Sequence, residues 1–364
     1  MGTTIHEVLA ASTLLGVTDK IVGGLPNYHL PPGMLPTSGR PVQGNVGYIV
    51  RGNGANAHKA AKQAMRGSKS RPRTVSGLEQ KPEVLIHSAE NVSLKLDVLQ
   101  GLMSDENTTA GQFARSEVAR VQRESATLSR NLRVAAVTSM LGVGHIYFNS
   151  DGELLPSSSG AVIDVDYSIP ANNQNQLNGI IDVKWDTATA KIHKHVELIH
   201  EAALQTCGRP IKYAIYGANV KSYLLANNYT KDQITRNQRV NEGMTGAVTG
   251  FDLFDIRWIP AYGAFFKDSS DAYQKLIAND KVVFLPEPDP SWFEMQEGFE
   301  MIPTAGFGTG GDLLSLLQSS TPRQGIFQYA YGNVDPMSAT LVYGDNFLPA
   351  LHVPESVFIA DVDF

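Results

Sequence analysis

Residues 107–141 read NTTAGQFARSEVARVQRESATLSRNLRVAAVTSML, the longest stretch of the chain with helical periodicity. Apolar or small side chains recur three or four residues apart, the spacing of one helix face. The stretch lacks proline, and Gly142 and Gly144 follow it, which favours a single helix ending at a glycine. At 1.5 Å per residue it would span about 50 Å. One small domain cannot cover such a helix, so we expect it to run across the molecule as a spine.

The spine is predicted to have one buried stripe and polar faces. We expect its core to consist of Phe113, Val118, Val121, Leu128 and Leu132. Its arginines are expected on the polar faces: Arg115, Arg120, Arg123, Arg130 and Arg133. The stripe weakens over residues 122–126, which argues against a coiled coil.

Upstream of the spine, two predicted strands at residues 46–50 and 83–87 enclose a basic segment. Residues 51–81 contain eight lysines and arginines, one acid and few large apolar residues, which is typical of a projecting loop. We expect the loop to contact an acidic surface of a neighbouring subunit through Arg51, Lys59, Lys62, Arg66, Lys69, Arg71 and Arg73. A solvated charge run and nucleic-acid binding stay open, although aromatic residues for base stacking are missing from the run.

The first 42 residues begin with a short helical pattern and continue into a segment rich in proline and glycine. That segment is irregular and yet apolar, so it must lie against something. An extended arm fits it, placed either on a neighbouring subunit or on its own domain. Downstream of the spine, short strands at residues 145–148 and 161–165 precede an α/β pattern from residue 187, and the end is rich in strands.

No motif for catalysis or cofactor binding stands out. The single cysteine, Cys207, excludes an internal disulfide and a cysteine metal site. His193 and Glu197 lie four residues apart on a predicted helix, but the zinc-protease spacing is absent, which favours a solvated helix face. The glycines at residues 306–311 lack the preceding strand of a dinucleotide site, which favours a loop. We therefore predict no catalytic, cofactor-binding or metal site.

The composition further narrows the class of protein to which the chain can belong. A net charge of −6 argues against a protein that grips nucleic acid along its surface. The N-terminus lacks the pattern of a signal peptide, and no apolar stretch approaches the roughly 20 residues of a membrane span. We expect a protein made in a reducing cytoplasm.

The order of elements resembles the lambda-like phage major capsid protein E family, which has the Hong Kong 97-type capsid fold. Residues 181–185, 281–286 with Glu297 and Gly298, and 347–359 are similar to stretches of that family. The resemblance implies an α+β fold with the following parts: N-terminal arm 1–43, extended E-loop hairpin 44–97, peripheral (P) domain with the spine helix 98–186, axial (A) domain 187–322, and strands 323–364 that return to the P domain and end in the A domain.

The resemblance implies a structural protein that is not an enzyme and needs no cofactor. It would self-assemble into hexamers and pentamers of an icosahedral shell around packaged double-stranded DNA, in the host bacterial cytoplasm. Implied partners are a separate scaffolding protein and a portal protein, with a decoration protein as a further candidate; no membrane is involved. Two alternatives stay open: an encapsulin-like compartment shell, and a cytoplasmic α/β enzyme built on residues 187–285.

Overall fold

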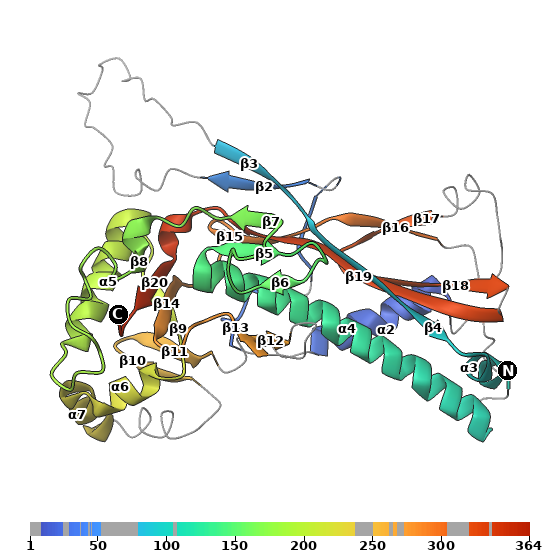
Figure 1. Ribbon diagram of the computed structural model, residues 1–364, viewed down its shortest axis with the longest axis horizontal. Coiled ribbons are helices and arrows are strands. Elements are labelled where there is room, and N and C mark those ends of the chain that lie inside the picture. Colours follow the sequence, from blue (N-terminus) through green and yellow to red (C-terminus); the bar gives the residue numbers. More distant parts are fainter. Residues whose placement is uncertain are drawn as a thin grey trace, which may run out of the picture.

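Two long elements cross the molecule together in the computed structural model (Figure 1). Helix α4 (Thr109–Val143) has 35 residues and strand β19 (Met337–Leu351) has 15, so each spans about 50 Å. The structure describes residues 9–24, 29–36, 38–42, 44, 46–51, 79–104, 108–236, 250–261, 265–267, 273–303, 320–334 and 337–364. Thr108 caps the start of α4 by accepting a hydrogen bond from the Gly111 amide, and Gly144 ends it in the left-handed region at φ 82°.

The first sheet is built around β19. Strands β4 (Ile86–Leu94) and β18 (Phe327–Val334) pair antiparallel with it, and β15 (Phe293–Glu297) pairs with its last residues. Strand β1 (Arg40–Pro41) adds to β15 in parallel. Helices α2 (Ala11–Gly24) and α3 (Leu96–Met103) pack on α4 beside this sheet. We call α2, α3, α4 and this sheet the spine region.

The second sheet forms an α/β unit with the order β10-β11-β9-β14-β20-β8. Its strands are β8 (Gln174–Asn175), β9 (Ile211–Tyr216), β10 (Phe251–Leu253), β11 (Ile256–Pro260), β14 (Lys281–Pro286) and β20 (Phe358–Asp361). Helices α5 (Ile192–Cys207), α6 (Val220–Ala226) and α7 (Asn228–Arg236) accompany it. Trp185, Trp258 and Phe284 fill its interior, and the Trp258 indole donates to the Leu253 carbonyl at 3.0 Å.

Smaller elements surround these two units. They are the hairpins β2 (Val46–Arg51)–β3 (Glu79–Val84), β12 (Phe265–Lys267)–β13 (Tyr273–Lys275) and β16 (Phe299–Pro303)–β17 (Ser320–Gln324), the sheet of β5 (His145–Phe148), β6 (Leu154–Leu155) and β7 (Ile163–Asp166), and the 3-10 helices η2 (Ala171–Asn173) and η3 (Pro354–Ser356). In Figure 1 the β2–β3 hairpin leads away from the body. None of the described helices is long and apolar enough to cross a membrane.

One hydrophobic core joins the spine region to the α/β unit. It contains Leu30 and Met34 of the arm, Ile49 of β2, the C-terminal half of α4, and Ile215 and Val283 of the second sheet. The described arm residues therefore lie on their own subunit, which decides between the two placements left open for that part of the arm. Because the core is continuous, the two units should move as one body.

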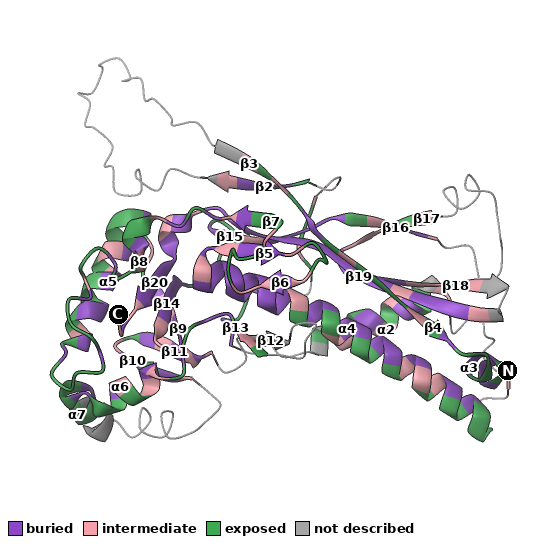
Figure 2. Ribbon diagram, in the orientation of Figure 1, coloured by how far each residue is buried: buried purple, intermediate pink, exposed green. Residues whose placement is uncertain are grey.

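The predicted core of the spine helix is wrong at two positions. Val118 and Val121 are buried and Leu132 is partly buried, but Phe113 is 63% exposed and Leu128 is 51% exposed. The buried face turns around α4 along its length, from one side near Val118 to all sides over residues 134–142, where the helix is covered throughout (Figure 2). Arg130 and Arg133 are also buried, contrary to the expectation that they lie on polar faces.

These exposures give a direct test of how α4 is covered. Leu102 of α3 is 1% exposed in the cluster that contains Val118, so Leu102→Ala should lower the free energy of unfolding by about 2–5 kcal/mol. Leu128→Ala should change it by less than about 0.5 kcal/mol, because the side chain is already half in solvent. Urea unfolding of unassembled subunits measures both. A cost for Leu128→Ala as large as for Leu102→Ala would contradict this placement.

Candidate functional site: an anchoring strand beneath the arm and the hairpin

Strand β15 contacts the arm, the β2–β3 hairpin, strand β19 and the spine helix, and we call it the anchoring strand. It pairs with β19 on one edge and with β1 of the arm on the other. Side chains alternate along a strand, so Glu294 and Gln296 project to one face and Glu297 to the opposite face. The first face holds the β2–β3 hairpin and the second holds the spine helix.

Gln296 holds the base of the hairpin through its side-chain amide. It accepts a hydrogen bond from the Tyr48 amide at 2.9 Å and donates one to the Tyr48 carbonyl at 2.8 Å. Within the described residues, β2 pairs with strand β3 alone. The side-chain amide of Gln296 bonds to the Tyr48 backbone in the way that a second neighbouring strand would. Because Gln296 is 3% exposed, these bonds are shielded from water.

His352 and Glu294 continue this contact. The Val50 amide donates to His352 Nδ1 at 3.1 Å, so Nε2 carries the proton that faces Glu294 Oε1 at 3.1 Å. Arg40 of the arm reaches the same carboxylate at 3.2 Å. Burial would raise the pKa of Glu294, but the hydrogen bonds from His352 and Gln296 and the charge of Arg40 outweigh it and lower that pKa. Arm and hairpin therefore share one carboxylate.

Gly47 permits the close approach of the hairpin. A Cβ atom there would lie 2.6 Å from the Leu348 side chain and 2.7 Å from Gln296 Oε1. Both contacts are shorter than van der Waals distance, so any side chain would push β2 away from the anchoring strand.

A buried charge cluster fixes the spine helix to the other face. The Arg133 guanidinium donates to both oxygens of Asp345 on β19, at 2.5 and 2.6 Å, and to Glu297 Oε1 at 2.6 Å. Its Cζ atom lies 5.3 Å from the centre of the Phe347 ring. All three charged side chains are nearly inaccessible to water. The two-pronged contact with Asp345 sets the rotation of α4 against β19.

The charges in this cluster do not balance, since two carboxylates face one guanidinium. Burial alone would lower the pKa of Arg133, but Asp345 and Glu297 outweigh it and raise that pKa. Burial raises the pKa of Asp345, Arg133 opposes this shift, and Glu297 adds to it. Arg133 thus stays charged and is the cation that stabilises both acids.

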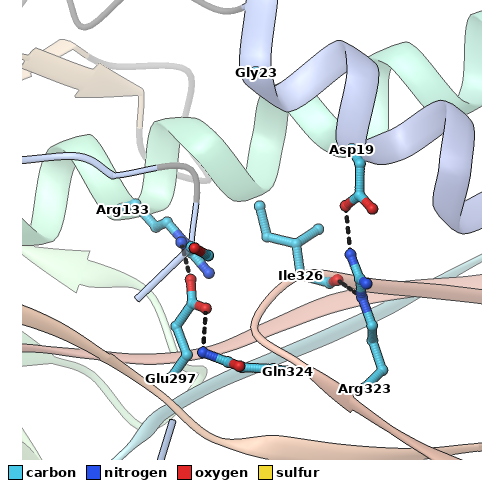
Figure 3. Close-up of a pocket in the computed structure, with 8 residues that line it drawn as sticks. Asp19, Gly23, Arg133, Glu297, Arg323, Gln324 and Ile326 are labelled. Carbon is cyan, nitrogen blue, oxygen red and sulfur yellow. Dashed lines mark hydrogen bonds and ion pairs between the residues drawn. The ribbon is translucent and has the colours of Figure 1, made fainter. Parts of the chain in front are cut away.

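Gln324 links the cluster to the arm. Its side-chain amide donates to the Gly39 carbonyl at 2.7 Å and to Glu297 Oε2 at 3.1 Å, while the Val42 amide donates to the Glu297 carbonyl at 2.9 Å. Figure 3 shows Arg133 and Glu297 on one side of a cavity of 270 Å³ and the Arg323–Asp19 ion pair on the other. Arg323 lies on β17 and Asp19 lies on α2, so this pair ties the β16–β17 hairpin to the arm helix.

His29 fastens the arm to α4 directly. Its Nε2 atom lies 2.7 Å from Thr138 Oγ1, whose own hydroxyl donates to the Val134 carbonyl at 2.6 Å, so His29 is the donor. Burial lowers the pKa of His29 to about 4. The ring is therefore neutral at pH 7, which suits its apolar surroundings.

The basic residues predicted to contact a neighbour lie mostly outside the described part of the chain. These are Lys59, Lys62, Arg66, Lys69, Arg71 and Arg73. Arg51 ends strand β2, and its side chain also lies outside the described residues. Lys81 at the end of the same run contacts its own subunit, with bonds to Glu83 and to the Asp166 carbonyl. The predicted contact with a neighbour stays a prediction.

The helix considered for metal binding differs from expectation. His195 is buried and not solvated: it accepts a hydrogen bond from Trp185 Nε1 at 3.0 Å, and its Nε2 lies 2.9 Å from Asp182. His193 stacks on Tyr229 with ring centres 4.0 Å apart. The described residues contain no group of three histidine, cysteine or acidic side chains arranged to hold a metal. Cys207 is buried, which raises its pKa, and residues 306–311 lie outside the described part.

Sequence reasoning missed the anchoring strand altogether. Residues 293–297 read FEMQE, which gives no clear strand pattern because the acids and the amide are themselves buried. For Arg133 a signal existed. It lies four residues after buried Ser129 and three before buried Ala136, which is core spacing. An arginine at core spacing indicates a buried carboxylate partner.

Removing the guanidinium tests the cluster. Arg133→Met should lower the free energy of unfolding by about 3–5 kcal/mol at pH 7, because two buried carboxylates lose their cation. The loss should shrink as the pH falls from 7 towards 4. A carboxyl whose folded-state pKa is raised contributes stability that is present at low pH and is lost as the pH rises. Arg123→Met, on the exposed side of the same helix, is the control. Equal costs for the two variants, or a pH-independent cost, would contradict the cluster's role.

Comparison with known proteins fits this architecture. A prophage protein from Escherichia coli CFT073, provisionally assigned as a capsid protein, superposes with a TM-score of 0.55 at 13% identity, covering 97% of this chain and 99% of that one. A phage-related protein from Bordetella bronchiseptica gives 0.52 at 13% identity, covering 95% and 96%. The mature capsid of bacteriophage PhiM1 gives only 0.42 at 10% identity, covering 91% and 89%. The first two show that the mixed helix and sheet fold is shared.

Among curated proteins no relative matches the chain. The sequence model of the phage major capsid protein E family matches residues 57–296, which is more than half of the chain. That range includes most of the basic run, the spine helix, the α/β unit up to β14 and all but the last residue of the anchoring strand. The chain therefore belongs to the phage major capsid protein E family.

Proposed function

We propose that this major capsid protein self-assembles into the hexamers and pentamers of an icosahedral phage head that encloses double-stranded DNA. As a member of its family it is a structural protein of the virion capsid and not an enzyme. The proposal includes a Hong Kong 97-type fold, with the N-terminal arm in residues 1–43, the E-loop in 44–97 and the peripheral domain with the spine helix in 98–186. The axial domain would span residues 187–322, and strands in 323–364 would return to the peripheral domain and end in the axial domain. Assembly would occur in the host cytoplasm, with separate scaffolding and portal proteins.

The observation that carries the proposal is the way the hairpin is held. Strands β2 and β3 leave the body, and their base is fastened to the anchoring strand by the Gln296 amide and by His352. The fastened base sets the direction in which β2 and β3 leave the subunit. The basic segment between these strands would then bury area against a neighbour beyond what two compact bodies share.

The distribution of charge also supports a contact between the basic segment and a neighbouring subunit. The segment between the two strands is strongly basic, while the whole chain carries a net charge of −6, so the remainder of each subunit is acidic. A basic projection meeting an acidic neighbour brings opposite charges together at each repeat of the shell. An acidic lumen would also leave packaged DNA free to move.

Reversing charges in the loop tests this. A variant with Lys62→Glu, Lys69→Glu, Arg66→Glu and Arg71→Glu should keep the circular dichroism and unfolding midpoint of the wild type and form no shells by negative-stain electron microscopy. The matched control reverses four exposed lysines elsewhere: Lys20, Lys95, Lys191 and Lys194. It has the same net charge and should assemble. Normal shells from the loop variant would remove the basis for the proposed contact.

A further inference from the structure

Two backbone amides of β2 are bonded by side chains of the body and not by β3. Tyr48 donates to the Gln296 side chain at 2.9 Å, and Val50 donates to His352 Nδ1 at 3.1 Å. Alternate residues of an antiparallel strand face its partner strand, so these two amides, two positions apart, share the outer edge of β2. Opposite Tyr48 on β3 lies Pro82, which has no amide hydrogen to offer. The hairpin base is thus held at two points, and Val50 is the one nearer to the basic segment.

The two acceptors respond differently to protons. The side-chain amide of Gln296 does not titrate, so its oxygen accepts a hydrogen bond at any pH near neutrality. The His352 ring accepts from Val50 only while it is neutral, with its one proton on Nε2. Once Nδ1 is protonated as well, both ring nitrogens are donors, and no rotation of the ring restores an acceptor. The Val50 amide would then face another N–H group at a side chain that is only 7% exposed.

The charges beside His352 favour a second proton on the ring. Glu294 of the anchoring strand lies 3.1 Å from Nε2, and Arg40 of the arm bonds to the same carboxylate at 3.2 Å. Burial opposes ionisation of Glu294, but its hydrogen bonds from His352 and Gln296 outweigh burial and lower its pKa, so the carboxylate is charged. A protonated ring therefore keeps its contact with the anchoring strand and loses its contact with the hairpin.

We propose that His352 is a proton-operated release for the end of the hairpin base that lies nearer to the basic segment. The neutral ring holds Val50, and the protonated ring releases it, while Gln296 keeps its bonds to Tyr48. The bond is therefore present at high pH and is lost as the pH falls through the range in which histidine titrates. This release deepens the proposed function, on which it rests, because it makes the fastening of the projecting hairpin adjustable.

Amide hydrogen exchange of unassembled wild-type subunits, resolved to single residues, tests this release. Each rate is divided into the intrinsic rate of the unfolded chain at the same pH, which gives the protection of that amide. Between pH 8 and pH 6 the protection of Val50 should fall about threefold or more, because its acceptor is lost. The protection of Tyr48 should stay constant, since its acceptor does not titrate, and it serves as the internal control.

Two variants extend the test. His352→Asn places an amide oxygen near the position of Nδ1 and removes the titrating group, so Val50 should be equally protected at both pH values. Glu294→Gln removes the negative charge that favours the charged ring, so the loss of Val50 protection should move to lower pH. If either variant fails to fold, the wild-type comparison of Val50 with Tyr48 still decides.

The outcomes separate this inference from the proposed function. Constant protection of Val50 in the wild type, or an equal fall for Val50 and Tyr48, would overturn the release. The same fall in His352→Asn as in the wild type would also overturn it. All of these results come from unassembled subunits and leave the shell untested. Normal shells from the charge-reversed loop variant would instead contradict the contact with a neighbour and leave the release of Val50 standing.

Discussion

The salt bridge of Arg133 to Asp345 and Glu297 is the constraint on which the spine region depends. It joins the longest helix and the longest strand of the described residues to the anchoring strand, and its side chains are nearly inaccessible to solvent. Burying three charges is costly, and apolar residues of similar volume often give equal or greater stability. What the cluster adds is a fixed orientation of the helix, because a guanidinium can donate to two carboxylates in only a few geometries.

The arm and the β2–β3 hairpin are both positioned by contacts with the strand that carries Glu297. Glu297 also accepts a hydrogen bond from Gln324, which bonds to the arm at Gly39. The residue before Glu297 on the strand, Gln296, bonds to the base of the hairpin. The same strand thus orients the arm and the hairpin relative to the spine helix. The continuous core carries that orientation into the α/β unit. In a shell, where contacts repeat many times, small errors in the direction of a projection would add up around each ring.

Periodicity predicted the spine helix and the strands at residues 46–50, 145–148 and 161–165 close to where they lie, because these patterns are local. Periodicity failed to predict which side chains are buried where burial depends on partners that are distant in the sequence. Arg133 meets acids 164 and 212 residues away, and nothing near it in the sequence announces them. Phe113 and Leu128 were assigned to the core because apolar residues usually are, although much of any protein surface is apolar. The anchoring strand was missed because its polar side chains act as partners for backbone and charge inside the protein.

Amide hydrogen exchange of unassembled Gln296→Met subunits would show whether the anchoring strand holds the hairpin. Methionine keeps the volume of the side chain and removes both bonds to Tyr48. We expect faster exchange over residues 46–51 and unchanged exchange over residues 132–142 of α4, with exposed Gln100→Met behaving like the wild type. Unchanged exchange over residues 46–51, or a uniform increase across the subunit, would contradict this role of the anchoring strand.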